Sequence, residues 1–93
     1  MKKYAKRTAA EDNVATCVAD VVSGEEVYIK TNGGESVCKA NSEIPFGHKI
    51  ALQDIKQGSF VYKYGEAIGK ATQDIKTGDW VHTHNVVDHY EVL

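Results

Sequence analysis

Two nearly identical nine-residue segments constrain the fold of this chain more than any other feature. Residues 53–61 read QDIKQGSFV and residues 73–81 read QDIKTGDWV, at an offset of 20. Two looser copies, DVVSGEEV at 20–27 and EIPFGHKI at 43–50, keep the same frame. In that frame an acidic residue and an apolar residue precede two free positions, a glycine, two more free positions and a second apolar residue. The frame predicts one structural device used four times.

Each copy of the frame predicts a tight turn followed by a strand. An aspartate side chain can accept a hydrogen bond from the backbone two residues further on. The glycine supplies a left-handed conformation without the steric penalty of a Cβ atom. The β-branched and aromatic residues that follow it suit a pleated, half-buried strand. We therefore expect a turn at each glycine and a short strand after it.

The spacing of the copies predicts an all-β fold of short strands and tight turns. The copies lie too close together for solenoid repeats, and no long helical pattern separates them. A further hairpin is expected over 27–40, because Val27 and Ile29 alternate with polar residues and Asn32-Gly33-Gly34 suits the turn. We expect a basic flexible arm at 1–11, one domain at 12–86 and a C-terminal tail at 87–93.

Length and charge limit the function classes. The 93 residues suffice for one small domain with a thin core, and the net charge of -2 argues against broad binding to nucleic acid or anionic membranes. No apolar stretch is long enough to span a membrane. The basic start lacks the apolar run of a secretory signal, since Glu11 and Asp12 follow almost at once.

The cysteine pattern indicates a reducing compartment. Cys17 and Cys38 lie far apart in the sequence, and neither belongs to a CxxC pair, so zinc spacing is absent. A single disulfide is improbable in a chain without a secretory signal. We expect two reduced thiols in core or half-buried positions, and a cytoplasmic protein.

The two close copies diverge immediately after the shared frame, which marks the strand ends as a candidate site. Tyr62-Lys63-Tyr64-Gly65 follows one copy, and His82-Thr83-His84-Asn85 follows the other. The turns do not require these polar and titratable groups. If His82 and His84 lie on one strand, both imidazoles share a face beside Trp80.

Two histidines on one face can contact a metal or an anionic substrate, but they do not make a complete metal site, which needs at least three protein ligands in most catalytic centres. The alternative is an exposed strand whose histidines stack near Trp80. For His48-Lys49 the alternative is a solvated turn, and for Lys63-Tyr64-Gly65 it is an ordinary strand end. Asn13 could serve only to cap the first strand, and His89 is expected to be an ordinary surface residue.

Five segments in order carry a family resemblance: DNVA at 12–15, IPFGHKIAL at 44–52, the DI-x-x-G of the third copy, V-x-KYGE-x-IG-x-A at 61–71 and DI-x-x-G-x-x-VHTHN at 74–85. The set resembles the SAF domain at the amino end of the altronate and galactarate dehydratase family. It extends from about Asp12 to Asn85. The HTHN segment favours the altronate and sulfolactate branches over galactarate dehydratase.

The resemblance implies a small β-clip fold like that of antifreeze-like domains. It also implies metal-dependent β-elimination of water from a sugar acid, giving a 2-keto-3-deoxy acid. Where this domain is a separate chain, it resembles the small subunit of a two-chain lyase, inactive alone, whose larger subunit holds most of the divalent metal site (iron or manganese) and the base. The same arrangement is implied for sulfolactate sulfo-lyase.

The resemblance also suggests roles for particular residues. His82 and His84 are the expected catalytic residues, and both are possible metal ligands. The expected substrate-binding residues are Asn13, His48, Lys49, Lys63, Tyr64, Gly65 and Asn85. A binding module without catalytic function, either carbohydrate-recognising or an assembly subunit, stays open, as does a homo-oligomer of the isolated chain. The basic amino-terminal arm and the acidic tail have no counterpart in the motif.

Overall fold

The computed structural model describes residues 2–31 and 33–88, and it confirms the all-β fold. This part of the chain contains nine strands. It has no helix long and apolar enough to cross a membrane. The strands are β1 (Lys3–Lys6), β2 (Val14–Cys17), β3 (Glu26–Thr31), β4 (Gly34–Lys39), β5 (Lys49–Ala51), β6 (Phe60–Lys63), β7 (Glu66–Ala71), β8 (Trp80–Val81) and β9 (Val86–Asp88).

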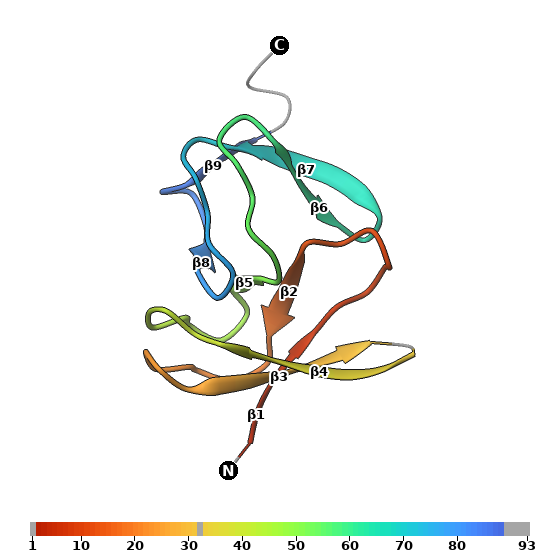
Figure 1. The fold of residues 1–93 in the computed structure, drawn as a ribbon, viewed down its shortest axis with the longest axis vertical. Helices are drawn as coiled ribbons and strands as arrows, with labels where there is room; N and C mark the ends of the chain where they lie inside the picture. Colours follow the sequence, from red (N-terminus) through yellow and green to blue (C-terminus); the bar gives the residue numbers. More distant parts are fainter. Residues whose placement is uncertain (1, 32, 89–93) are drawn as a thin grey trace.

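The strands form two sheets. Six of them pair in the order β4-β3-β1-β2-β5-β8, and the other three in the order β6-β7-β9. Figure 1 shows the β3–β4 hairpin at one end of the molecule and the β6–β7 hairpin toward the other, with β2 and β5 between them. All pairs are antiparallel except β1 with β3. The hairpin expected over 27–40 is confirmed as β3–β4.

The four copies of the repeated frame form four turns of the same kind. Their glycines, Gly24, Gly47, Gly58 and Gly78, have φ angles of 89°, 85°, 87° and 92°. In each turn the residue after the glycine donates its N–H to the carbonyl two residues before the glycine. A hydrogen bond of this span with glycine at the third position is the pattern of a type II turn. The predicted left-handed glycines are confirmed.

The turns associate in pairs, which the sequence did not predict. An antiparallel bridge joins Val21 of the first copy to Ile44 of the second, and another joins Ile55 of the third to Ile75 of the fourth. The domain is therefore built from two similar halves. One half contains the turn pair of the first two copies, and the other half contains the turn pair of the last two copies.

The acidic residue of the frame has a different partner from the one predicted. Asp54 accepts a hydrogen bond from Thr77 N–H at 2.8 Å, and Asp74 accepts one from Gln57 N–H at 2.9 Å. These bonds cross to the partner turn instead of closing the residue's own turn. The bridge between the paired turns explains this, because it brings the partner's exposed N–H groups beside the carboxylate. The prediction of a local aspartate turn was wrong.

The repeated apolar positions form the core. The four first apolar residues of the frame and the four last ones are all at most 3% exposed. They divide between two clusters, one for each half of the domain. They are Val21, Val27, Ile44 and Ile50 in the first cluster, and Ile55, Val61, Ile75 and Val81 in the second. The frame thus encodes the core as well as the turns.

The amino-terminal segment is not a flexible arm throughout. Residues Lys3–Lys6 form β1, which pairs with both β2 and β3 inside the six-stranded sheet. Only Ala5 of this strand is fully buried, at 1% exposure. A single small inward residue among lysines gives almost no hydrophobic pattern, which explains the error. The assigned domain boundary at residue 12 is therefore too late.

The predicted tail boundary at residue 87 is also contradicted. Val87 and Asp88 belong to β9, which pairs with β7 opposite Lys70 and Gly69. Residues 89–93, including His89, lie outside the described residues. The two thiols match expectation: both are free, Cys17 is buried and Cys38 is half-buried. Burial raises the pKa of both, that of Cys17 to about 11.

Two glycines with the same backbone conformation should respond differently to substitution. A Cβ at Gly58 would meet nothing within 4 Å, whereas one at Gly78 would lie 2.1 Å from the Lys39 carbonyl oxygen. We expect Gly58→Ala to lower the free energy of unfolding by about 1 kcal/mol, through left-handed strain alone. Gly78→Ala should lower it by about 3 kcal/mol, because backbone must also move. Urea unfolding of both variants measures this, and equal losses would contradict it.

Candidate functional site

The pairing of β5 with β8 brings two predicted site residues together. Lys49 lies opposite Val81 and Ile50 lies opposite Trp80, so continuing the register places His48 opposite His82. The two imidazole ring centroids are 4.4 Å apart. Both residues are half-buried. In the sequence the two histidines lie in separate motifs, and only the strand register shows that they are neighbours.

Trp80 organises this histidine pair. Its indole Nε1–H donates a hydrogen bond of 3.1 Å to Nδ1 of His48, and its ring stacks on His82 at 5.8 Å with an interplanar angle of 10°. Because Nδ1 of His48 is an acceptor here, the neutral ring carries its proton on Nε2. The sequence analysis named Trp80 only as a neighbour. The sequence signal that could have identified Trp80 was its position, one residue before the last residue of the fourth copy of the frame.

His82 and His84 do not lie on one strand as predicted. Strand β8 ends at Val81, and 82–85 form a bend and turn. Asn85 holds this turn: its Oδ1 accepts from His82 N–H and its Nδ2 donates to the Trp80 carbonyl, both at 2.9 Å. The side-chain amide closes the loop locally, which ends the strand. Asn85 is 4% exposed and therefore positions the turn.

The third histidine of this region, His84, also contacts Trp80. It is exposed, and its ring lies 4.9 Å from Trp80. Together with Trp80 and Asn85 it lines a surface hollow of about 210 Å³ to which Asp74 and Asp79 also contribute. His84 thus shares this hollow with two aspartates.

The pKa of His82 reports a positive environment. Partial burial lowers this pKa below its ordinary value of 6.5, and the charges of His48 and Lys49 lower it further. His84 adds a smaller effect of the same sign. No carboxylate contributes. The neutral form of His82 is therefore favoured near pH 7.

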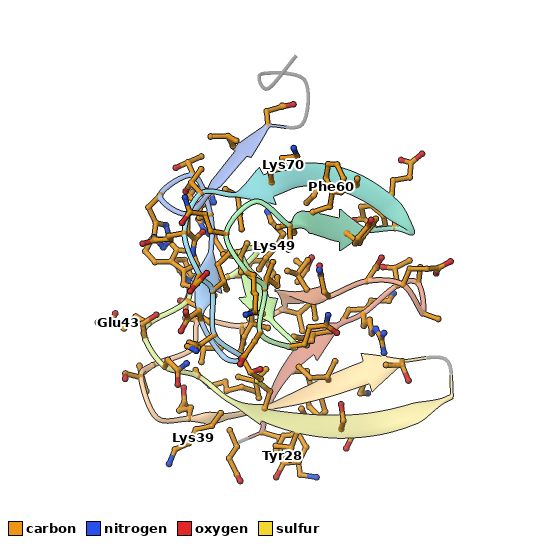
Figure 2. All side chains as sticks on the ribbon, turned by 45° about the horizontal axis from the view of Figure 1, so that its top comes forward. Tyr28, Lys39, Glu43, Lys49, Phe60 and Lys70 are labelled. Carbon is orange, nitrogen blue, oxygen red and sulfur yellow. The ribbon has the colours of Figure 1, made fainter. Side chains whose placement is uncertain are left out.

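Lys49 lies on the other face of β5 from the histidine pair, and Lys63 of β6 acts on it electrostatically. Along this strand, Ile50 points into the first core cluster and Ala51 into the second, so Lys49 shares the side of Ala51. Figure 2 shows Lys49 in the middle of the molecule, between the β6–β7 hairpin with Phe60 and Lys70 and the outer strands with Tyr28 and Lys39. Burial lowers the pKa of Lys49, and the charge of Lys63 lowers it further.

Lys49 has no anionic partner among the described residues. The ion pair that the structure records in this part of the chain joins Lys3 to Glu25, at 3.4 Å. A half-buried ammonium beside a second ammonium is unfavourable unless an anion is supplied from elsewhere. A negative charge placed beside the two ammonium groups would relieve this repulsion.

The predicted segment Lys63-Tyr64-Gly65 forms the end of the β6–β7 hairpin. Tyr64 and Gly65 have φ angles of 57° and 75°, as in the two-residue type I′ turn. Tyr64 is 61% exposed, and the Lys63 Nζ atom lies 4.9 Å from the centre of its ring. Left-handed tyrosine is unusual and requires support from elsewhere.

That support is Asp12, which the sequence analysis missed. Its carboxylate is 2% exposed and accepts hydrogen bonds from the N–H groups of Tyr64, Gly65 and Ala9, at 3.0, 2.8 and 3.0 Å. Burial opposes ionisation, but these bonds together outweigh it and lower the pKa of Asp12. The only sequence signal for a structural role of Asp12 was its place beside Asn13 in the DNVA segment.

Asn13, just before β2, supports the same hairpin from outside it. Its Oδ1 accepts from Tyr62 N–H at 2.8 Å, and its Nδ2 donates to the Phe60 carbonyl at 3.1 Å. Asn13 is 6% exposed. The amide pairs with the backbone of β6 as a neighbouring strand would. Asn13 and Asn85 are thus matched supports for the two segments that carry Lys63 and His82.

The described residues of this chain do not build a complete metal centre. Among them, no group of three or more histidine, cysteine, aspartate or glutamate side chains is placed to hold an ion. His48 and His82 provide two imidazoles, and Nδ1 of His48 is already occupied by the Trp80 N–H. A metal with this pair as its protein ligands would need donors from another chain.

These observations define a small all-β domain with paired glycine turns, in which His48, Lys49 and His82 lie at the β5–β8 strand pair. Comparison with known families gives the same class. Residues 3–89 match the model of the altronate/galactarate dehydratase SAF domain. The chain belongs to this family.

The relatives fall into two groups by length. Altronate dehydratases from Bacillus subtilis and Escherichia coli are 40% and 42% identical over 91% and 82% of this chain, but the match spans only 16% and 14% of those proteins. The (2R)-sulfolactate sulfo-lyase subunit alpha of Chromohalobacter salexigens is 46% identical over 83% of this chain and 85% of its own length. The domain therefore occurs both within long proteins and as a short subunit.

Proposed function

We propose that this chain is the SAF-domain subunit of a sugar-acid hydro-lyase, with altronate as its first candidate substrate, acting together with a larger catalytic chain. The observation that carries the proposal is the cluster of His48, Lys49, Lys63 and His82. Burial and the charge of Lys63 lower the pKa of Lys49, burial and the charges of His48 and Lys49 lower that of His82, and no carboxylate contributes to either shift. Such a cluster is suited to bind a carboxylate.

Substrate binding would satisfy the cluster. The carboxylate of a sugar acid placed near Lys49 and Lys63 forms charge-assisted hydrogen bonds and offsets their mutual repulsion. It also raises the pKa of His82, since a nearby negative charge stabilises the imidazolium ion. Binding thus converts His82 from a neutral group into a proton donor.

The protonated His82 then has a role in elimination. A base removes the proton alpha to the carboxylate, the bond from the β carbon to its hydroxyl breaks, and His82 gives that oxygen a proton so that water departs. The enol left behind tautomerises to the 2-keto-3-deoxy acid. The dianionic intermediate is stabilised by the lysine charges. His84, at Trp80 but beside acidic groups, is the second candidate proton donor.

The base and the divalent metal are assigned to the larger chain. The described residues of this chain lack a complete metal site, and the long relatives devote most of their length to other segments. The metal would supply Lewis-acid stabilisation of the substrate oxygens. Iron and manganese are the metals the family resemblance suggests. This chain contributes cations, a proton donor and exclusion of water.

Sulfolactate sulfo-lyase is the second candidate activity. It is favoured by the relative of similar length, the subunit alpha from Chromohalobacter salexigens. The same acid-binding cluster serves either substrate, but the leaving group differs. Sulfite departs as a stable anion and needs no proton, whereas hydroxide does. The role of His82 therefore distinguishes the two reactions.

The deciding experiment is purification of the tagged chain from its source cell, with mass spectrometry of proteins that co-elute in a fixed ratio. The complex is assayed for keto-acid formation from altronate and for sulfite release from sulfolactate. The double variant His82→Ala, His84→Ala should reduce altronate turnover about 100-fold or more, the usual contribution of a general acid. Unchanged altronate turnover would refute the proton-donor role.

A matched control separates chemistry from folding. Thr83→Ala alters the same exposed turn without removing a titratable group, and it should leave turnover unchanged. If the chain purifies alone and binds sugar acids without a partner, the non-catalytic binding module becomes the better description. Sulfite release that survives the double histidine variant would identify the sulfo-lyase.

A further inference from the structure

An exposed apolar surface borders the candidate site. Phe46 and Val22 are 64% and 53% exposed, and Pro45 is also exposed. We propose that these three residues, the apolar turn pair, form the surface on which the larger catalytic chain docks. This inference rests on the two-chain arrangement of the proposed function, and it adds the location of the contact.

The other half of the domain provides an internal comparison. The positions equivalent to Val22 and Pro45 in the third and fourth copies of the frame are Lys56 and Lys76, and the position equivalent to Phe46 is Thr77. The backbone is the same in both pairs, with a bridge between the turns and left-handed glycines. The turn geometry therefore does not require apolar residues at these positions.

The cross-turn hydrogen bond is also conserved between the halves of this chain. Phe46 N–H donates to Asp20 at 2.8 Å, as Thr77 N–H donates to Asp54 at 2.8 Å. The Phe46 backbone is thus fixed in the same way as that of Thr77. The turn does not need the Phe46 ring. The exposed ring therefore indicates a protein interface, because large exposed aromatic side chains are favoured as interface anchors.

The location of the apolar turn pair suits a catalytic partner. His48 N–H donates to the Pro45 carbonyl at 3.0 Å, so the turn that presents Phe46 continues directly into the histidine pair. A protein seated on Phe46 would reach His48 and His82. The matching segment makes up 16% and 14% of the two long altronate dehydratases, so most of each of those proteins lies outside it.

Site-specific crosslinking tests this inference in the full chain. A benzoyl-phenylalanine replaces Phe46 in one variant and Gln57, the exposed residue before the glycine of the third copy, in the other. Both are introduced in the source cell, irradiated and mapped by mass spectrometry. We expect the probe at 46 to crosslink to a large chain of the dehydratase and lyase family, and the probe at 57 to give no such product.

Affinity provides the second readout. Phe46→Ser should raise the dissociation constant of the complex about tenfold or more, as for an interface anchor, while Gln57→Ser leaves it unchanged. A crosslink from 46 to a second copy of this chain, to an unrelated protein or to nothing overturns the inference, as do equal products from both probes. Crosslinking as expected with unaltered turnover in the His82→Ala, His84→Ala variant would refute the proton-donor role and leave the docking surface standing.

Discussion

Replacement of Lys49 by methionine should weaken substrate binding and stabilise the domain at once. In the assembled enzyme we expect the KM for the sugar acid to rise about 10- to 100-fold, the usual contribution of a hydrogen bond to a charged group. The free energy of unfolding of the isolated chain should increase by about 0.5–1 kcal/mol, since methionine keeps the packing of the aliphatic stem. Opposite effects on binding and stability are typical of a functional residue.

The stability gain follows from the direction of the pKa shift. Burial and Lys63 lower the pKa of Lys49 below 10.5, so folding disfavours its charged form. The penalty is fully present below the folded-state pKa and disappears as the pH rises toward the unfolded value. Lys49→Met removes it at neutral pH, and the gain over wild type should shrink in alkaline solution. Urea unfolding at several pH values measures both.

The pKa of His82 provides an independent readout of the Lys49 charge. The charge of Lys49 contributes to the lowered pKa of His82, so the variant should shift this pKa upward, toward 6.5. Ring-proton NMR titration of the isolated chain measures the shift without substrate or partner. Lys56→Met, at an exposed turn position, is the control and should change neither the pKa nor KM. A destabilised Lys49→Met with unchanged KM would contradict the assignment of an acid receptor.

The repeated frame made the fold predictable, because it contains both the turns and the core. Its glycines are left-handed and its eight apolar positions are buried, as an apolar residue on each side of a tight turn would suggest. The pairing of the turns could not be predicted. It depends on bridges between residues 20 or more positions apart, such as Val21 with Ile44, which no local pattern records.

The candidate site was predictable as a set of residue types but not as an arrangement. The divergence of the strand ends singled out Lys63 and His82, and the family motif added His48 and Lys49. Their contacts depend on the β5–β8 register, which alone places His48 opposite His82. Two short strands without a hairpin turn between them leave that register undetermined in the sequence.

Asp12 is the residue whose loss should damage the fold most. Three backbone N–H groups donate to its buried carboxylate, and two of them, from Tyr64 and Gly65, lie in a left-handed turn. Asp12→Ala leaves these donors without an acceptor, which should lower the free energy of unfolding by about 4 kcal/mol. A domain of this size has only about 5–14 kcal/mol in total. Asp12→Asn keeps one acceptor oxygen and should lose about 2 kcal/mol.

The pH dependence of stability separates the charge of Asp12 from its packing. Because the folded-state pKa lies below 3.8, the ionised carboxylate stabilises the domain at higher pH, and this contribution is lost as the pH falls through the folded-state value. Wild type should therefore lose stability on acidification below about pH 4 more steeply than Asp12→Asn. Asp54→Ala, which removes an exposed acceptor, should cause a smaller loss than Asp12→Ala.

The Asp12 variants also connect the fold to the site. The turn that Asp12 supports directly follows Lys63, whose charge acts on Lys49. Asp12→Asn should therefore raise KM at a temperature where the variant is still folded, because the β6–β7 hairpin no longer holds Lys63 beside Lys49. A variant that unfolds earlier but keeps the wild-type KM would show that the hairpin end is not part of the acid receptor.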